Sequence, residues 1–360
     1  MNYFFIGAIV VLFLLVFLMI YMYKKTYVIK DLKKIKNKYY RTITRILLIL
    51  LPYILFGFVN GVVIVFHTAI FLGISDIINH FIKSKKKRHI VSYVAVGVTI
   101  AYLIMGFFLN QHVFETVYNI ETDKNIGVDN FKIVQISDAH AGTSFDGKKF
   151  KKIVSNINSK VDSDIVVITG DLVDDNTSYE DMALTCEALS LLTPKYGTYF
   201  VYGNHDKGYY GRNFTAKDLE KELLKNNVKI LEDEIVYITS NIVLIGRKDR
   251  QDSTRLDIEE LTNGIDKSKY IIDLNHQPND YDNESKANID LVLSGHSHGG
   301  QIFPLGPISK LIKANNEYDG LHKRGNTSFI VNSGISGWEV RFKTGTKSEY
   351  AVINIRGNNE

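Results

Sequence analysis

The hydrophobic pattern divides the chain into an apolar front third and a longer remainder in which apolar and polar runs alternate. Residues 3–23, 46–82 and 90–109 are almost free of charged residues. A helix needs about 20 apolar residues to cross a bilayer, so 46–82 is too long for one crossing, and Asn60-Gly61 within it is a turn signal. We therefore predict a transmembrane domain over residues 1–110, with about four helices at 3–23, 44–60, 62–82 and 90–110.

The first apolar run also has to be weighed as a secretory signal peptide. It lacks a positively charged leading segment, it is longer than the apolar core of such peptides, and no small-residue cleavage site follows it. A membrane anchor that stays with the protein fits this sequence better.

The distribution of charge predicts how the helices cross the membrane. Residues 24–45 carry nine Lys and Arg, and residues 83–88 carry five. The positive-inside rule assigns both loops to the cytoplasm, which requires an even number of crossings between them. A helical hairpin over 46–82 supplies that number, whereas one bent span would leave a basic loop outside. The prediction is a multi-pass protein of the cell membrane whose residues 111–360 are extracytoplasmic.

Beyond residue 130, short apolar runs alternate with polar clusters and with helix-like segments. The runs are rich in Ile, Val and Tyr, as β-strands are. The predicted strands are 131–137, 164–169, 198–203, 242–246, 270–274, 289–294, 328–332 and 350–355. The predicted helices are 147–160, 179–192 and 215–227. This alternation predicts an α/β domain over residues 130–360, with residues 111–129 as a connection to the membrane domain.

The composition narrows the kinds of site and partner. The single cysteine, Cys186, excludes an internal disulfide framework and a multi-Cys metal site, and its apolar helical context predicts a buried structural thiol. Residues 111–360 carry 29 Lys and Arg against 37 Asp and Glu. We expect no nucleic acid as partner, because tracking a phosphate backbone needs a basic surface.

Five predicted strands end in residues that bind metals or activate water in other proteins. The segments are Asp138-Ala139-His140, Gly170-Asp171-Leu172-Val173-Asp174, Asn204-His205-Asp206, Asn275-His276-Gln277-Pro278 and Gly295-His296-Ser297-His298-Gly299-Gly300-Gln301. Each alone is ordinary turn chemistry. Because ligands gather at the carboxyl ends of strands in α/β sheets, five such segments in one domain favour one shared site.

The residue types indicate which chemistry this site performs. Imidazoles and carboxylates without thiolates suit Mn²⁺, Zn²⁺ and Fe. Two such ions about 3.5–4 Å apart can clamp a phosphoryl group and generate hydroxide at neutral pH. Close cations repel, so they need anionic ligands and a carboxylate between them. In Asp-x-His and His-x-His, alternate residues of an extended segment point the same way and can reach one cluster.

The series D-x-H, G-D-x-x-D, G-N-H-D, a lone His and G-H-x-H resembles the calcineurin-like metallophosphoesterase superfamily over about residues 130–340. The extended forms G-H-S-H-G-G-Q and N-H-Q-P resemble a bacterial branch of membrane- or envelope-associated phosphoesterases, which includes enzymes acting on lipid-linked or nucleotide-linked diphosphates. The resemblance implies an αββα two-sheet sandwich of the α/β class, which here follows the membrane helices. It also implies two divalent metal ions as cofactors, with Mn, Zn and Fe all compatible.

The resemblance further implies a role for each motif residue. The implied ligands are Asp138, His140 and His298 for the first metal, Asn204, His276 and His296 for the second, and Asp171 as a bridge between the two. His205 and Asp206 are the implied catalytic pair, in which His205 stabilises or protonates the leaving oxygen and Asp206 orients His205. The expected reaction is in-line attack on phosphorus by a metal-bridging hydroxide.

We expect a metal-dependent phosphoric ester hydrolase of the phosphodiesterase or pyrophosphatase type. Its expected partners are the lipid bilayer and a phosphate-containing small molecule or lipid-linked substrate of the cell envelope. The alternative is a membrane transporter or sensor with a regulatory phosphoesterase-like domain. A non-catalytic scaffold is disfavoured, because no metal position departs from the pattern.

Two further features have two interpretations each. The basic residues after strand 242–246 either meet a substrate anion or belong to a solvated loop; they are Arg247, Lys248, Arg250 and Arg255. Trp338 either borders the mouth of the site or packs in the core.

Overall fold

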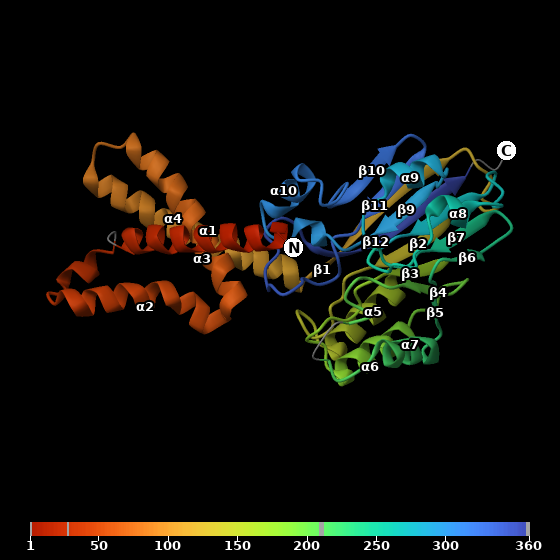
Figure 1. The fold of residues 1–360 in the computed structure, drawn as a ribbon, viewed down its shortest axis with the longest axis horizontal. Helices are drawn as coiled ribbons and strands as arrows, with labels where there is room; N and C mark the ends of the chain where they lie inside the picture. Colours follow the sequence, from red (N-terminus) through yellow and green to blue (C-terminus); the bar gives the residue numbers. More distant parts are fainter. Residues whose placement is uncertain (1, 27–28, 209–211, 358–360) are drawn as a thin grey trace. The chain divides into compact units, whose positions relative to one another are not determined.

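Figure 1 shows a helical part and a strand-rich part of the chain, and the computed structural model describes residues 2–26, 29–208 and 212–357. Contacts within the chain separate a first unit, Met1–Met105, from a second unit, Gly106–Glu360. The helices of the first unit are α1 (Asn2–Lys25), η2 (Lys30–Lys34), α2 (Lys38–Phe56), α3 (Phe58–His80) and the larger part of α4 (Lys85–Gln111). The last turn of α4 belongs to the second unit.

Among the described residues, three helices are long and apolar enough to cross a membrane. They are Lys38–Phe56, Phe58–His80 and Lys86–Gln111. These helices overlap the predicted spans 44–60, 62–82 and 90–110, and their crossing of a membrane stays a prediction. The predicted span 3–23 falls in helix α1, but the side chains of residues 2–12 lie outside the described residues, so this crossing stays a prediction.

The turn between α2 and α3 lies at Gly57 and not at the predicted Asn60-Gly61. Gly57 has a φ of +80°, which side chains with a Cβ rarely adopt. Gly61 is instead a buried residue of α3, where a Cβ would lie 2.8 Å from the Cα of Tyr53. The glycine of the Asn-Gly pair therefore serves close helix packing, which local turn chemistry does not reveal.

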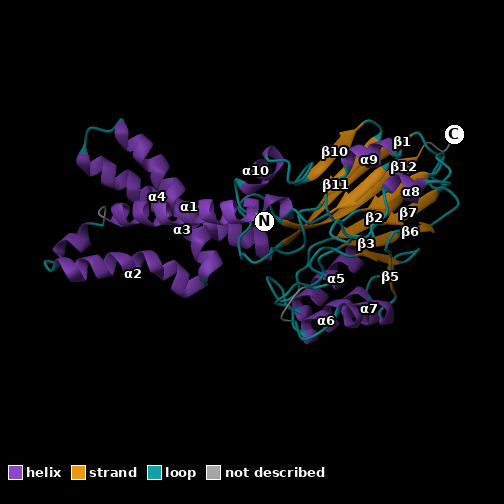
Figure 2. Cartoon of the chain, viewed as in Figure 1, coloured by secondary structure: helices purple, strands orange, loops and turns teal. Residues whose placement is uncertain are grey.

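The second unit contains two six-stranded sheets, whose strands Figure 2 shows in orange. In spatial order, the first sheet consists of β1 (Val113–Thr122), β12 (Ser348–Gly357), β2 (Phe131–Ile136), β3 (Ile165–Thr169), β4 (Thr198–Val201) and β5 (Val228–Ile230). The second sheet consists of β10 (Gly320–Arg324), β11 (Thr327–Val331), β9 (Leu291–Ser294), β8 (Tyr270–Leu274), β7 (Ile242–Gly246) and β6 (Glu234–Tyr237). The helices of this unit are α5 (Gly147–Lys160), α6 (Tyr179–Leu189), α7 (Ala216–Lys225), α8 (Ile258–Thr262), α9 (Tyr281–Lys286), η3 (His298–Gly300) and α10 (Leu305–Leu311).

The two sheets share one hydrophobic core. Ile133 and Val167 of the first sheet lie in the same buried cluster as Leu244 and Ile272 of the second. The other face of the first sheet packs against α5, α6 and α7, and Cys186 is buried there as expected. The other face of the second sheet packs against α8 and α9. These layers confirm the predicted αββα sandwich.

Residues 113–122 form a strand, although the sequence predicts a connection over residues 111–129. Strand β1 pairs in parallel with β12, from Val113 opposite Ser348 to Thr122 opposite Gly357. It lies at the edge of its sheet, and only Ile120 of its residues is fully buried. An edge strand carries no continuous apolar run, so the hydrophobic pattern does not reveal it. The edge strands β5, β6 and β10 escape prediction for the same reason, whereas the helices α8–α10 have only five to seven residues, too few to show a helical period.

Candidate metal centre

The five motif segments meet because the strands that precede them run in common directions. Strands β2, β3 and β4 are mutually parallel in the first sheet, and β8 and β9 are parallel in the second. The residues that follow parallel strands emerge at one edge of a sheet. The structure brings the segments from both sheets together at that edge.

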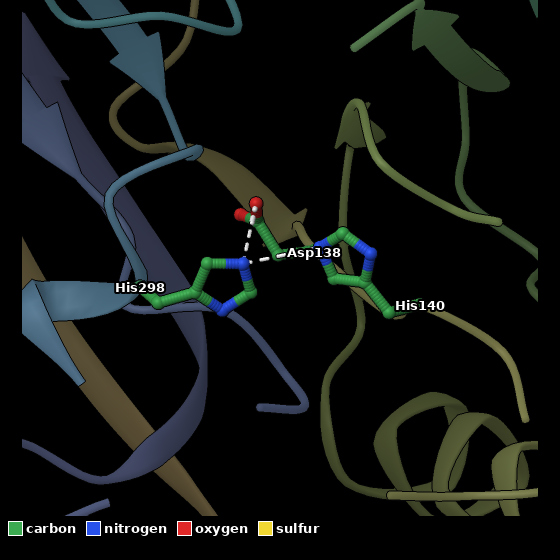
Figure 3. A group of neighbouring side chains, drawn as sticks. All are labelled: Asp138, His140 and His298. Atoms are coloured by element: carbon green, nitrogen blue, oxygen red, sulfur yellow. Dashed lines mark hydrogen bonds and ion pairs between the residues drawn. The ribbon is translucent and has the colours of Figure 1, made fainter. Parts of the chain in front are cut away.

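Asp138, His140 and His298 form the first cluster, and their ligand atoms all lie within 4.8 Å of one another. The Nε2 atoms of His140 and His298 are 3.1 Å apart, and Nε2 of His298 is 3.5 Å from Oδ1 of Asp138. All three residues are buried. Figure 3 shows the two imidazole rings flanking the carboxylate of Asp138, so that three donor atoms converge.

Asp171, His276 and His296 form the second cluster, with the same 4.8 Å limit between their ligand atoms. Nε2 of His276 lies 3.2 Å from Oδ2 of Asp171 and 3.2 Å from Oδ1 of Asn204. Nδ1 of His276 lies 2.7 Å from the carbonyl oxygen of Thr169. A carbonyl oxygen can only accept, so Nδ1 carries a hydrogen and the lone pair of the neutral ring is on Nε2, facing the cluster.

One carboxylate oxygen reaches both clusters. Oδ2 of Asp171 lies 3.2 Å from Nε2 of His276 and 3.8 Å from Nε2 of His140. The other oxygen, Oδ1, accepts the backbone N–H of His205 at 2.9 Å, which fixes the orientation of the carboxylate. This is the position that a carboxylate between two cations requires.

The protonation states of the buried carboxylates and imidazoles in the two clusters are compatible with bound cations. Burial would raise the pKa of Asp171, but His276 and His140 outweigh it and hold that pKa below its usual range. Burial lowers the pKa of His296 to about 4 and also lowers the pKa of His298. Burial opposes charge on His276 as well, yet Asp171 raises the pKa of His276 to about 10. Facing imidazole nitrogens and buried carboxylates, with no thiolate, fit two divalent ions.

Five of the residues in the two clusters have a left-handed backbone conformation. Their φ values are +53° for Asp138, +39° for His140, +52° for Asp171, +68° for His296 and +50° for His298. Residues other than glycine rarely adopt this conformation, and such strain collects at functional sites. The strained turns direct the side chains toward one another as soon as each strand ends.

Gly170 of the G-D-x-x-D segment leaves room for the second cluster. Its φ is +85°, and a Cβ there would lie 2.6 Å from Nδ1 of His276 and 2.6 Å from the backbone nitrogen of Gly203. Only glycine allows the turns after β3 and β4 to approach His276 this closely.

The structure corrects the role that the sequence predicts for Asp206. The carboxylate of Asp206 is fully buried and accepts four backbone N–H groups, those of Gly203, Asp171, Leu172 and Val173. Both oxygens are therefore occupied by the main chain and not by the ring of His205. Asp206 instead joins the turn after β4 to the turn that carries Asp171.

His205 lies beside the first cluster. Its ring centroid is 5.3 Å from that of His140 and 5.6 Å from that of Trp338. Among the described residues, its buried Nδ1 has no hydrogen-bond partner. Trp338 is 42% exposed, which places it at the mouth of the site and not in the core.

Two residues near the ligands have no predicted role. Asp174 is the last residue of the G-D-x-x-D motif, and its Oδ2 lies 3.4 Å from Nδ1 of His140, so the motif itself is the signal that identifies it. Lys343 is fully buried and donates from Nζ to the carbonyl oxygens of Ser333 at 2.6 Å and Gly334 at 2.9 Å. Burial lowers the pKa of Lys343 to about 7. No sequence pattern distinguishes this lysine from exposed ones.

The basic residues after β7 separate into structural and accessible ones. Arg247 is buried and pairs with Asp280 at 2.7 Å and with Glu284 at 3.5 Å. Lys248 donates to Thr254 Oγ1 at 2.9 Å. Arg250 and Arg255 line a cavity of about 290 Å³ together with Arg247, and contact of these residues with a substrate anion stays a prediction.

Comparison with known proteins gives matches for most of the chain. The profile of the calcineurin-like phosphoesterase family matches residues 131–300. An uncharacterized metallophosphoesterase of Helicobacter pylori is 32% identical over 320 residues, covering 84% of this chain and 81% of that protein. A transmembrane protein with metallophosphoesterase domain from Danio rerio is 30% identical over 238 residues, covering 62% of this chain and 53% of that protein. The crystal structure of phosphopantetheinyl hydrolase from Mycobacterium tuberculosis is 10% identical with a TM-score of 0.37, covering 59% of this chain and 91% of that one.

Proposed function

This chain belongs to the calcineurin-like metallophosphoesterases, a family of phosphoester hydrolases that use two divalent metal ions, and on that premise we propose that it cleaves a phosphodiester or diphosphate in a lipid-linked or cell-envelope substrate. The chain is a membrane protein by its apolar helices and its transmembrane relatives. The observation that carries the proposal is the position of Asp171 Oδ2, within 3.8 Å of imidazole nitrogens from both clusters.

We assign the metal ligands as two sets with one shared member. The ligands are Asp138, His140 and His298 for one ion, Asn204, His276 and His296 for the other, and Asp171 for both. When bound, two divalent ions neutralise phosphoryl oxygens and lower the pKa of water. Mn²⁺, Zn²⁺ and Fe all accept these nitrogen and oxygen donors. Asp174 and the carbonyl of Thr169 hold the rings of His140 and His276 in position.

His205 is the residue of this chain that we assign to the proton transfer. Water adds to phosphorus in line with the leaving oxygen and gives up one proton to solvent, the bond from phosphorus to that oxygen breaks, and the leaving oxygen gains a proton from His205, which regains one from solvent. The ring of His205 is next to both His140 of the first cluster and the exposed Trp338. Asp206 contributes by fixing the backbone from which His205 and Asp171 project.

The membrane topology belongs to the same proposal. Basic residues dominate 24–45 and 83–88, which supports a multi-pass arrangement with both segments in the cytoplasm. The second unit is then extracytoplasmic, where lipid-linked and wall-linked phosphate esters occur. Its excess of acidic residues disfavours a polyanionic partner.

Asp171→Asn tests the assignment in the full-length protein in detergent. We expect hydrolysis of bis-p-nitrophenyl phosphate to fall by at least two orders of magnitude, because a neutral amide cannot offset two cations. The bound metal, measured by mass spectrometry, is expected to fall below two ions per chain. Thermal unfolding is expected to show that the variant still folds.

Asp175→Asn is the matched control, since Asp175 is exposed and lies four positions further along the same turn. It should keep the activity and metal content of the wild-type protein. An Asp171→Asn variant that binds two ions and retains full activity would show that the bridging assignment is wrong. A folded wild-type protein with both ions and no activity on phosphodiesters or diphosphates would refute the proposed function.

A further inference from the structure

Helix α10 directs its apolar side outward. Leu305, Ile308, Leu311 and Ile312 recur at intervals of three and four residues, which places them on one side of the helix. They are exposed by 53%, 43%, 81% and 69%, and the preceding Phe303 is exposed by 52%. We call these five side chains the α10 face. A helix packed on a domain turns its apolar side inward, so this orientation marks an interaction surface.

The opposite side of α10 is fixed by close packing. Gly306 is buried, and a Cβ there would lie 2.7 Å from the ring of Tyr318. The backbone of α10 thus packs closely against Tyr318 at Gly306, where a side chain would not fit. The outward position of the α10 face follows from that packing and not from a loosely held segment.

The α10 face is connected to the last turn of α4, which is part of the same unit. The backbone N–H of Phe303 donates to Oγ1 of Thr344 at 3.1 Å. The neighbouring Lys343 donates its backbone N–H to the carbonyl oxygen of Gly106 in α4 at 2.9 Å. The α10 face therefore lies beside the point where a membrane-length apolar helix ends.

The end of α4 is itself apolar and exposed. Phe107 and Phe108 are exposed by about half, at 45% and 51%. Phe107 also packs edge-to-face on Phe342, with ring centroids 6.4 Å apart. These aromatic side chains therefore lie near the C-terminal end of a helix that is long and apolar enough to cross a bilayer, where aromatic residues are enriched in membrane proteins.

Charge on α10 also suits a lipid surface. Lys313 lies just after the helix and is exposed, whereas Lys310 within the helix pairs with Glu317 at 2.8 Å. Long lysine side chains can run along an apolar surface and present their ammonium groups to lipid phosphates.

The same segment is joined to the mouth of the candidate metal centre. Gln301 donates from Nε2 to the carbonyl oxygens of Trp338 at 3.1 Å and Val340 at 3.0 Å. Its Oε1 accepts the backbone N–H of Trp338 at 3.0 Å. Trp338 in turn lies beside His205. The loop that opens α10 therefore positions Trp338 as well.

We propose that the α10 face, together with Phe107 and Phe108, inserts into the interface of the bilayer that α4 crosses. The insertion holds the mouth of the metal centre near the lipid headgroups. Resting on the proposed function, the substrate class that this geometry selects is a phosphate ester that carries a lipid chain and reaches the site from the membrane plane.

The single tryptophan of the chain allows a direct test in the full-length protein. In a Trp338→Phe background, Leu311→Trp places the only indole on the α10 face. Tyr237→Trp in the same background is the control, because Tyr237 is 56% exposed on β6, at the edge of the second sheet farthest from β10. Both proteins are placed in phosphatidylcholine nanodiscs with and without brominated acyl chains.

We expect brominated lipid to remove most of the emission of the Leu311→Trp protein and little of that of the Tyr237→Trp protein, because bromine quenches indole only on contact. Equal emission of the Leu311→Trp protein in both lipids would overturn the proposal, whether the indole is in water or covered by protein.

A pair of chromogenic substrates tests the substrate class. Hexadecyl p-nitrophenyl phosphate partitions into the bilayer, whereas bis-p-nitrophenyl phosphate stays in water, and both lose the same p-nitrophenol. We expect Leu311→Glu to lower the rate on the hexadecyl ester several-fold and to leave the rate on the soluble ester unchanged, with Tyr237→Glu altering neither. Equal losses on both esters would refute lipid delivery. If wild-type protein cleaves neither ester and no diphosphate, the proposed function fails, while the quenching result still decides the membrane contact.

Discussion

The variant Asp206→Asn is expected to destabilise the second unit, because it removes half of a buried acceptor. Oδ2 of Asp206 accepts from Asp171 at 2.8 Å and from Gly203 at 2.7 Å, while Oδ1 accepts from Leu172 at 2.8 Å and Val173 at 3.2 Å. An asparagine keeps one oxygen and turns an N–H₂ group toward two backbone N–H donors.

The magnitude follows from the two hydrogen bonds that the amide cannot make. A hydrogen bond to a charged group contributes about 1.5–3 kcal/mol, so the loss of two costs about 3 kcal/mol at the lower bound. For a unit of this size, that corresponds to a decrease in Tm of roughly 6–12 °C. Since the affected backbone carries Asp171 and His205, metal content and kcat should fall together.

The assay is thermal unfolding of the full-length protein in detergent, followed by the fluorescence of Trp338 beside His205. Asp175→Asn is the control with the same chemical change at an exposed position. If Asp206→Asn had the Tm and metal content of the wild-type protein but a greatly reduced kcat, Asp206 would act on the reaction and not on the backbone. That result would restore the role as the partner of His205 that the sequence suggests.

Three further predictions concern the same centre. Gly170→Ala should lower metal affinity and Tm, because a Cβ at this position would lie 2.6 Å from Nδ1 of His276. Metal titration measures the affinity and thermal unfolding measures Tm; unchanged values of both would contradict this prediction. Metal binding near pH 7.5 should release protons, because a metal needs neutral imidazole, whereas the pKa of His276 is raised to about 10 and the pKa of His140 is also raised by Asp174 in spite of burial. Calorimetry of metal binding in buffers of different ionisation enthalpy should therefore give a heat that depends on the buffer. Equal heats in all buffers would refute this prediction. The pKa of Lys343 falls from 10.5 to about 7 in the folded chain, so the unfolded chain binds more protons between these values and stability should rise with pH across that window. Lys343→Met should lack this contribution, which a comparison of Tm against pH for both proteins measures.

The parts of the centre that follow apolar strands could be predicted from sequence. Asp138, Asp171 and His276 each come directly after a buried strand, so strand order and parallel direction suffice to bring their side chains together. The α/β class was predictable for the same reason, since most buried strands are continuous apolar runs, whereas the division of the strands into two sheets came from the family resemblance.

The remaining parts depend on tertiary packing that leaves no local pattern. Nothing in Asn-His-Asp indicates whether Asp206 binds a ring or a backbone, because three of its four backbone donors belong to the turn after β3, more than 30 positions earlier in the chain. Lys343 is buried only because its ammonium group finds two carbonyl oxygens. Strand β1 is recognisable only by its pairing with β12, and Gly61 only by its contact with Tyr53.

The order of the strands also has a consequence for how the protein is made. Strand β12 is the last strand among the described residues, yet it lies between β1 and β2 in the first sheet. Until the ribosome has delivered Ser348–Gly357, the facing main-chain groups of β1 and β2 have no strand to pair with. The nascent chain is therefore already held in the bilayer while β1 and β2 still lack the strand that joins them. Unpaired strand edges attract other chains. A stop codon just before β12 would produce a membrane-inserted protein that aggregates or is degraded, even though every proposed metal ligand is present.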